Sequence, residues 1–363
     1  MPSRFLAMLG IAHPIIQAPM AGGATTPELV AAVSNAGALG SFAAATLSPA
    51  AMAEGVQRVR ALTTRPFNVN LFVLEEPALD EAALASAQER LQPYRAALGL
   101  AAAPRPTRFC ENNRAQIAAL LELAPPVVSF TFGVLDAGTV AQFRQNGSFV
   151  IGTATTVAEA RAWEAAGADA ICVQGIEAGG HRGTFLGDFE QAGIGLMALI
   201  PQVARAVNLP LIAAGGIMDG RGIAAALILG AQAAQLGTAF LCCDEAGIHP
   251  GWKQRIPLTS DDGTRLTRVY SGKYARSIVT DFMQELRPFE HDVPAYPIQN
   301  ALTGEIRRAA AQQGRLEMMS LWAGQGAALA RPMPAALLVQ TLTDELIIAQ
   351  PGRVYDKTGP DRA

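Results

Sequence analysis

The sequence predicts an α/β fold: a (β/α)8 TIM barrel with a smaller second domain after the eighth strand. Eight short apolar runs recur before residue 242, and helical patterns lie between them. The runs are continuous rather than alternating, as expected when both faces of a parallel sheet are covered. Eight such units in about 240 residues match the usual size of this barrel, about 250 residues. A doubly wound open sheet is the alternative, and the number and spacing of the strands favour the barrel.

The expected strands follow one another at fairly regular intervals. The first helix is expected after strand one, where Thr26 is a suitable N-cap and Pro27 suits the first helical position. This helix should end at Gly37, and the same glycine ending recurs at Gly167 and Gly230, each time before a new apolar run. The eight expected strands are 15–18, 38–43, 67–73, 127–132, 149–153, 170–173, 209–213 and 233–241.

The rhythm of strands and helices stops near residue 243. The following stretch is richer in charge, proline and aromatic residues. We therefore expect a barrel over 1–243, with roughly 320–350 packing back against it, and a smaller substrate or cap domain over 244–319. Helical patterns return over 302–313 and 317–330, and a final amphipathic helix is expected over 335–350.

The bulk composition indicates a large buried core. Hydrophobic residues make up 50% of the chain and charged residues 16%, against a usual charged share of about 25%. The formal net charge is −3 and no basic run occurs, so we expect no nucleic-acid partner.

The cysteines and histidines predict neither a disulfide framework nor a metal site. The four cysteines contain no C-x-x-C pair, and the four histidines show no ligand spacing. The N-terminus has no signal-peptide pattern, so a cytoplasmic location is expected. The uncharged stretch 222–243 is long enough for a membrane span, which needs about 20 residues. Its glycines and glutamines favour a helix followed by a buried strand, so no membrane partner is expected.

The stretch with the clearest chemistry follows the sixth expected strand. QGIEAGGHRGTF, at 174–185, contains four glycines together with Glu177, His181 and Arg182. Glycines allow the backbone to approach a ligand closely, and a histidine can act as a base near neutral pH. A structural turn with a surface histidine is the alternative. The barrel favours a functional loop, because active sites lie at the C-terminal ends of barrel strands.

Other polar and glycine positions should meet at the same end of the barrel. Asn70 lies inside the third strand, where core hydrogen bonding and ligand contact are both open. The Gly215-Gly216 turn after strand seven and the Gly237-Thr238 turn in strand eight fit the usual phosphate site of this barrel. Tight turns without a ligand are the alternative.

Several segments make the chain resemble the class I nitronate monooxygenases, formerly called 2-nitropropane dioxygenases. Four carry most of the resemblance: QAPMAGG (17–23), PFNVNLF (66–72), VSFTFG (128–133) and QGIEAGGHRGTF. QLGTAF, SGKYAR (271–276) and SLWAGQG (320–326) are also similar. Some members carry a second histidine within the VSFTFG-like segment, where this chain has Thr131.

The resemblance implies a non-covalent FMN cofactor and O₂-dependent oxidation of alkyl nitronates, propionate 3-nitronate above all, to a carbonyl product with nitrite or nitrate. His181 would be the catalytic residue, either orienting a nitronate or removing the α-proton of a neutral nitroalkane. Lys273 and Arg276 are candidates for attracting substrate anions, with a solvated surface position as the alternative for Lys273. The flavin contacts implied by motif are Asn70, Gln174, Gly179, Gly216, Gln235, Leu236, Gly237 and Thr238.

Two other functions fit the same barrel and glycine turns. One is an NAD(P)H-dependent flavin reductase of quinones or enoyl thioesters. The other is a phosphate-ligand or flavin-storage protein without turnover. The sequence leaves open whether the protein is a monomer or a dimer.

Overall fold

The computed structural model describes residues 4–75, 78–102, 106 and 108–349. Eight parallel strands form one sheet in the order β1-β9-β8-β6-β5-β4-β3-β2, and a bridge between Ile16 and Leu39 joins its two edges. The predicted (β/α)8 barrel is therefore confirmed. The strands are β1 (Ile15–Gln17), β2 (Gly40–Ala43), β3 (Phe67–Phe72), β4 (Val127–Thr131), β5 (Phe149–Ala154), β6 (Ala170–Gln174), β8 (Leu211–Ala214) and β9 (Ala233–Leu236).

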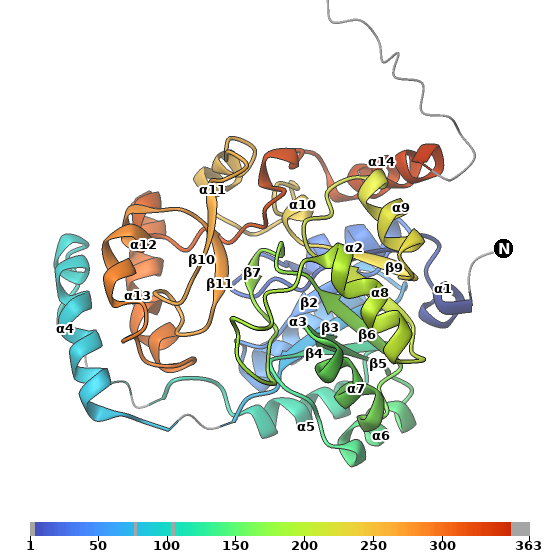
Figure 1. Ribbon diagram of the computed structural model, residues 1–363, viewed down its shortest axis with the longest axis horizontal. Helices are drawn as coiled ribbons and strands as arrows, with labels where there is room; N and C mark the ends of the chain where they lie inside the picture. Colours follow the sequence, from blue (N-terminus) through green and yellow to red (C-terminus); the bar gives the residue numbers. More distant parts are fainter. Residues whose placement is uncertain (1–3, 76–77, 103–105, 107, 350–363) are drawn as a thin grey trace, which may run out of the picture.

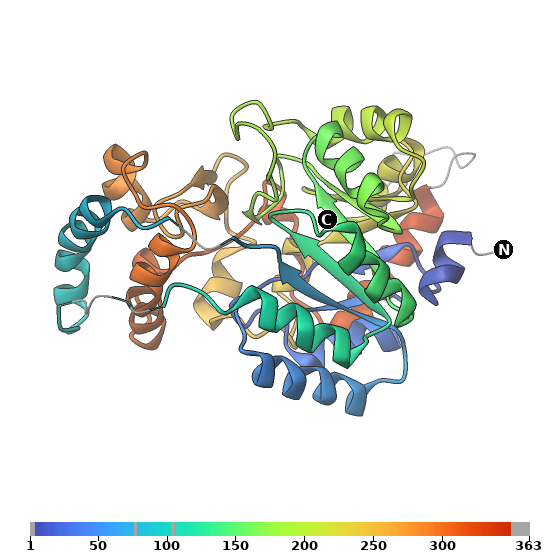
Figure 2. The same cartoon turned by 90° about the horizontal axis from the view of Figure 1, so that it is seen from below.

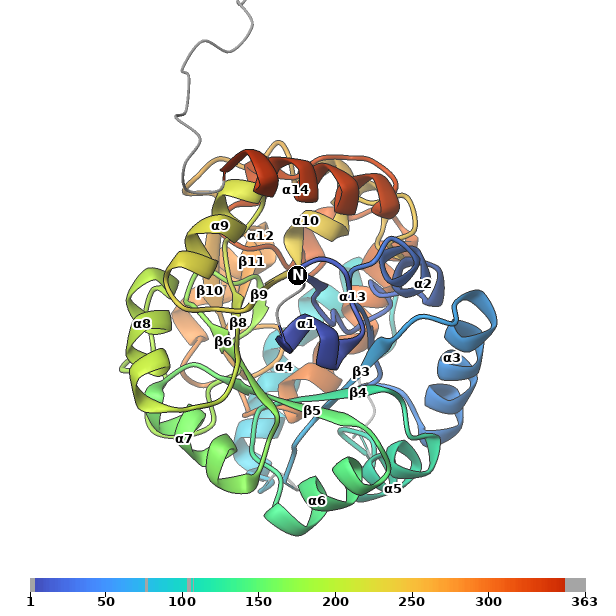
Figure 3. The same ribbon diagram turned by 90° about the vertical axis from the view of Figure 1, so that its right-hand side faces the viewer.

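A ring of helices surrounds the strands (Figure 3). The predicted cap of the first of these helices is present, because the Thr26 side chain accepts a hydrogen bond from Leu29 N at 3.0 Å. The ring consists of α2 (Pro27–Asn35), α3 (Pro49–Leu62), α5 (Asn113–Leu123), α6 (Ala137–Gln145), α7 (Val157–Ala166), α8 (Leu196–Ala206), α9 (Gly220–Ile228) and α14 (Ala335–Ala349).

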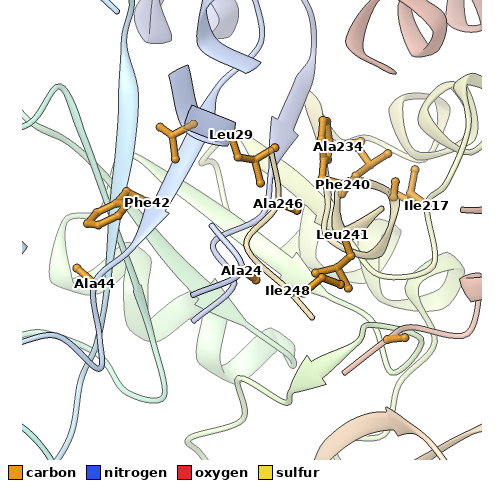
Figure 4. Close-up of a cluster of buried hydrophobic side chains, with 14 of the residues drawn as sticks. Ala24, Leu29, Phe42, Ala44, Ile217, Ala234, Phe240, Leu241, Ala246 and Ile248 are labelled. Atoms are coloured by element: carbon orange, nitrogen blue, oxygen red, sulfur yellow. The ribbon is translucent and has the colours of Figure 1, made fainter. Parts of the chain in front are cut away.

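Two apolar clusters hold the barrel together. One seals its N-terminal end, where Phe5, Leu6 and Leu9 of α1 (Arg4–Leu9) pack with residues inside the barrel such as Ile16 and Leu39. The larger cluster lies between the strands and the helices and extends to the segment after β9 (Figure 4). With its N-terminal end closed by apolar side chains, the barrel keeps its polar residues at the opposite end.

A smaller layer lies away from α1, next to the C-terminal ends of the strands (Figures 1 and 2). The third barrel connection contributes α4 (Glu81–Ala97), which packs on α13 (Ile298–Gln312) and joins it through an Arg95–Glu305 ion pair of 2.7 Å. The division of the chain at residue 243 stays a prediction. The other short elements are α10 (Thr238–Leu241), α11 (Pro250–Arg255), α12 (Asp281–Leu286), η1 (Arg287–Phe289), η2 (Leu316–Met318) and η3 (Ala327–Leu329).

A three-stranded sheet joins this layer to the histidine loop. Its order is β10-β11-β7, with β10 (Thr264–Thr267) and β7 (Gly180–His181) on either side of β11 (Ala275–Ile278). In the antiparallel β11–β7 pair, Ala275 lies opposite His181. The histidine therefore has its backbone held by the smaller layer and not only by the barrel.

Two expectations were wrong in detail. The eighth strand ends at Leu236, and α10 follows at once, since Phe240 N donates to Gly237 O at 2.9 Å. The helix expected over 317–330 does not form. Only the short 3₁₀ turns η2 and η3 lie there, because the chain between them runs closely along the barrel turns, where Gly324 N donates to Thr238 Oγ1 at 2.9 Å.

The final helix is confirmed as α14, and residue 350 of the expected range lies outside the described residues. Within the described chain, no helix has the length and apolar character needed to cross a bilayer. The four cysteines all lie in the described part of the chain, and no disulfide joins them.

Candidate functional site

The side chain of Gln174, at the end of β6, holds the histidine loop in place. Its Oε1 accepts from Gly183 N at 2.8 Å and from Arg182 Nη1 at 3.2 Å, and its Nε2 donates to His181 O at 3.1 Å. The loop is thus bonded to the barrel at His181 and at the two residues that follow it.

Arg182 is fully buried and serves the same loop. Its guanidinium donates to Gln174 O at 3.1 Å, to Gly175 O, and to Ala192 O at 3.2 Å. Burial lowers its pKa to about 10, and the nearby carboxylates oppose that shift. Arg182 remains charged at neutral pH, and its two terminal nitrogens are bonded within the loop, while Nε has no partner in the described part of the chain.

The two acidic residues near the loop are also used by the fold. Glu177 accepts from Leu196 N at 2.8 Å and 3.1 Å, which caps α8 where the N-cap residue is a glycine. Glu159, also fully buried, accepts from Thr155 N at 2.6 Å, from Leu186 N at 2.9 Å, and from Phe185 N. Neither carboxylate is therefore available for acid–base work on a substrate.

His181 lies among aromatic rings at the barrel mouth. Its ring centroid is 5.6 Å from that of Phe132, 5.7 Å from Tyr296 and 5.3 Å from Trp322. These rings come from a barrel strand end, the smaller layer and the returning 320–326 segment. Burial, followed by the positive charges of Lys273 and Arg307, lowers the pKa of His181 to about 3. The imidazole is therefore neutral at physiological pH.

Ser271 determines which nitrogen of the neutral ring carries the proton. His181 Nε2 and Ser271 Oγ are 2.8 Å apart, and the serine hydroxyl donates its single proton to Lys273 O at 3.0 Å. With the hydroxyl proton on Lys273 O, the serine oxygen accepts from Nε2–H, and this arrangement corresponds to the tautomer protonated at Nε2. No described residue is hydrogen-bonded to Nδ1, so this nitrogen has an unused lone pair.

Lys273 lies in the same cluster rather than on a solvated surface. Its ammonium is 4.9 Å from the centroid of the Phe132 ring and donates to Thr184 O at 2.6 Å. Phe132 has φ +80°, a strained conformation for a bulky residue. That conformation places one ring against both Lys273 and His181.

The glycine turns of β8 and β9 are neighbours, as the sequence predicted. Gly216 has φ +68°, and the backbone N–H groups of Gly216, Gly237 and Thr238 donate to no acceptor within the described part of the chain. The turn at 219–221 differs, because Asp219 caps α9 and Glu345 accepts from Gly220 N at 2.9 Å. Free donors are therefore concentrated at the first two turns.

The other predicted contacts lie at the same end of the barrel. Asn70 is buried and donates to Ser129 O at 3.1 Å, and Gln235 donates to Cys172 Sγ at 3.3 Å. Leu236 is a buried residue of β9. A Cβ on Gly179 would overlap the backbone of Ala323 and Gly324, which explains the glycine by packing. Whether these residues touch a cofactor stays a prediction.

Several residues of the cluster were not predicted from the sequence. Phe132, Ser271 and Trp322 lie in segments that carry the family resemblance, but none of them was named as a site residue. Tyr296 lies outside those segments. Thr131 itself is 3.3 Å from the Thr153 hydroxyl. Arg276, a candidate anion ligand, donates to Ile176 O at 3.1 Å and is used by the fold. No group of three or more metal-ligating side chains occurs among the described residues.

The barrel and its mouth define a (β/α)8 protein with a neutral histidine at the C-terminal ends of the strands. Residues 3–345 match the family model described as nitronate monooxygenase. A probable nitronate monooxygenase of Staphylococcus aureus (strain MSSA476) is 40% identical over 345 residues, which are 95% of this chain and 97% of that protein. The chain belongs to the nitronate monooxygenase family and is an oxidoreductase.

Two solved structures have the same architecture. A nitroalkane oxidase from Streptomyces ansochromogenes is 44% identical with a TM-score of 0.87, over 95% of this chain and 98% of the other. FabK from Thermotoga maritima is 30% identical with a TM-score of 0.75, over 96% of both chains. The similarity thus extends through both the barrel and the smaller layer.

Proposed function

We propose that this protein binds FMN at the barrel mouth and uses O₂ to oxidise alkyl nitronates, including propionate 3-nitronate. The product is a carbonyl compound with nitrite or nitrate. The observation that carries the proposal is the neutral His181 ring, whose Nδ1 is unbonded among aromatic side chains at the strand ends. Family membership and the similar nitroalkane oxidase support the same chemistry.

The residues of the β8 and β9 turns fit an FMN phosphate. Adjacent backbone N–H groups without internal acceptors form an anion site, and Gly216, Gly237 and Thr238 provide such groups. Asn70, Gln174, Gly179, Gln235 and Leu236 are the other proposed contacts. When bound, FMN supplies the redox chemistry, accepting electrons from the substrate and passing them to O₂.

The tautomer of His181 favours a base over an orienting donor. Nε2–H is committed to Ser271, so the remaining nitrogen can accept a proton but cannot donate to a nitronate oxygen. Nδ1 can remove the α-proton of a neutral nitroalkane and produce the nitronate in place. A positioned base contributes about 10²–10⁴-fold in rate. The anion formed would offset the positive charge of Lys273, which otherwise disfavours the imidazolium.

The aromatic rings around His181 suit an alkyl chain. Phe132, Tyr296 and Trp322 present apolar surface to the ring, and such surface excludes water from the reacting carbon. A nitronate supplied directly would bypass the proton step and use the remainder of the site.

Purification and oxygen uptake test the proposal. The protein should be yellow and should consume O₂ with propionate 3-nitronate, and anaerobic NADH or NADPH should not bleach it. Rapid bleaching by either nucleotide would instead indicate the flavin reductase. Bound flavin without O₂ uptake on any nitronate would indicate storage, and both results would contradict the proposal.

A further inference from the structure

We propose that Lys273 binds the oxygen atoms of the nitro or nitronate group, so that the smaller layer supplies the anion-binding half of the site. This inference rests on the proposed function and adds a residue that selects the charge of the substrate. It follows from the position of one ammonium group and from the hydrogen bonds that this group leaves unmade.

The Lys273 ammonium has donors to spare. An ammonium carries three N–H groups, and the structure uses one of them, toward Thr184 O at 2.6 Å. Among the described residues, no carboxylate lies within ion-pair distance of Nζ. A charge removed from water normally has a partner. A ligand with two oxygens could accept hydrogen bonds from the two remaining N–H groups.

Lys273 and His181 contact the same aromatic ring. Nζ lies 4.9 Å from the Phe132 centroid, and the His181 ring lies 5.6 Å from that centroid. Ser271 connects the two residues along the chain, because its hydroxyl bonds both His181 Nε2 and Lys273 O. A small substrate could therefore meet the base with its α-carbon and the ammonium with its nitro oxygens.

The neighbouring arginines cannot take this role. Arg182 donates to the carbonyl oxygens of Gln174, Gly175 and Ala192. Arg276 donates to Ile176 O at 3.1 Å and 3.3 Å. Arg182 Nε has no partner among the described residues, but its guanidinium is fully buried against the loop backbone. The unused donors of Lys273 lie instead beside the Phe132 ring that His181 also contacts.

The charge of Lys273 is also poorly compensated. Burial lowers its pKa to about 8; Glu159 opposes this shift, while Arg182 and Arg268 add to it. The Glu159 carboxylate is occupied by N–H groups of Thr155, Phe185 and Leu186, and the nearby His181 is neutral. Lys273 is therefore an ammonium below about pH 8, and anion binding should weaken above it.

Sodium nitrite is a suitable probe, because its planar O–N–O anion reproduces the nitronate oxygens. We would titrate the flavin-loaded protein with nitrite by calorimetry and measure its competitive inhibition of propionate 3-nitronate oxidation. Lys273→Met should raise both the nitrite dissociation constant and the KM about ten- to hundredfold, the usual range for a hydrogen bond to a charged group. Lys273→Arg should retain most of the binding.

Lys253→Met is the matched control. Lys253 donates to Cys243 O at 2.7 Å and Asp244 O at 3.2 Å in another part of the chain. This variant loses the same charge as Lys273→Met, but at a position that the proposal does not place at the anion site. Its nitrite affinity should therefore stay within about twofold of wild type. Thermal melting would compare the folding of all three variants.

Two results would overturn the inference. One is nitrite binding in Lys273→Met within twofold of wild type. The other, measured on the wild-type protein and independent of any variant, is nitrite affinity that does not fall between pH 7 and pH 9. Wild-type protein that binds nitrite through Lys273 but oxidises no nitronate would instead contradict the proposed function and leave the anion site intact.

Discussion

The two sides of the loop over 174–186 differ in how they use their polar groups. On the barrel side, Gln174, Arg182 and Glu159 make most of their hydrogen bonds to backbone groups. On the side of the smaller layer, His181 keeps an unbonded nitrogen and Lys273 keeps unused donors. Charge and burial alone therefore do not identify a functional residue, because the fully buried Arg182 has a structural role.

Backbone strain also occurs beside His181. Phe132 follows β4, has φ +80° and contacts both His181 and Lys273. Strain of this kind costs about 1–3 kcal/mol and is concentrated at functional sites. We infer that barrel-side substitutions will mainly lower stability, while substitutions facing the smaller layer will mainly lower activity.

The largest expected effect is that of His181→Ala on a neutral nitroalkane. Without the base, kcat on nitroethane should fall about 10²–10⁴-fold, and kcat on the preformed nitronate should fall much less. Oxygen uptake with both substrates measures this ratio. His291→Ala, which alters an exposed histidine, is the control and should keep wild-type rates. An equal loss on both substrates would exclude the base role.

Glu159→Ala should be the most destabilising change on the barrel side. It leaves the N–H groups of the buried Thr155, the partly buried Phe185 and the exposed Leu186 without an acceptor. An unsatisfied buried donor costs about 1–3 kcal/mol. We expect a loss of about 3 kcal/mol in the free energy of unfolding, measured by urea denaturation. Glu54→Ala on the exposed face of α3 should cost little. A similar loss in both variants would contradict the structural role that we assign to Glu159.

The fold was predictable because its strands are continuous apolar runs closed by glycines. The same signal failed at 233–241, where the stretch is mostly apolar on both sides of Gly237 and periodicity cannot separate a buried strand from a short buried helix. It failed again at 317–330, where close approach to the β9 turn excludes a helix. Both errors involve tertiary contacts that local sequence does not encode.

The site was only partly predictable for a related reason. His181 and the glycine turns stand out in the sequence, because their residue types and spacing imply chemistry. Ser271 lies 90 residues from His181, and the partly buried Lys273 packs against Phe132, which follows a different strand. Nothing in the segment SGKYAR distinguishes a buried lysine from a solvated one, so only the folded chain reveals its role.

Acid should destabilise the protein through His181. Its pKa is about 3 in the folded state and about 6.5 when unfolded, so both states are neutral above pH 6.5. Below that pH, His181 binds a proton in the unfolded chain but stays neutral in the folded protein until the pH approaches 3. Stability is therefore lost as the pH falls, by about 2 kcal/mol at pH 5. His181→Gln should lose that much less between pH 7 and pH 5, as measured by urea denaturation, and identical losses would contradict a neutral buried ring.

Ser271→Ala should have the smallest effect and tests the tautomer directly. Without this acceptor, the ring proton can move from Nε2 to Nδ1, and the base is then lost in part of the molecules. We expect kcat on nitroethane to fall about tenfold, the equivalent of one hydrogen bond of about 1.4 kcal/mol. Nitrite inhibition, which depends on Lys273, should stay within about twofold. Ser271→Thr keeps the hydroxyl and should restore most of the rate, and Ser260→Ala on the exposed surface is the control.

Nitrogen-15 NMR separates this positioning role from a general loss of packing. The protein has four histidines, and the His181 signals can be assigned from their absence in His181→Gln. Wild-type shifts should correspond to a neutral ring protonated at Nε2, and Ser271→Ala should shift toward a mixture of tautomers. If the ring in the wild-type protein carries its proton on Nδ1, the base assignment is wrong, and His181 must act toward the substrate as a hydrogen-bond donor.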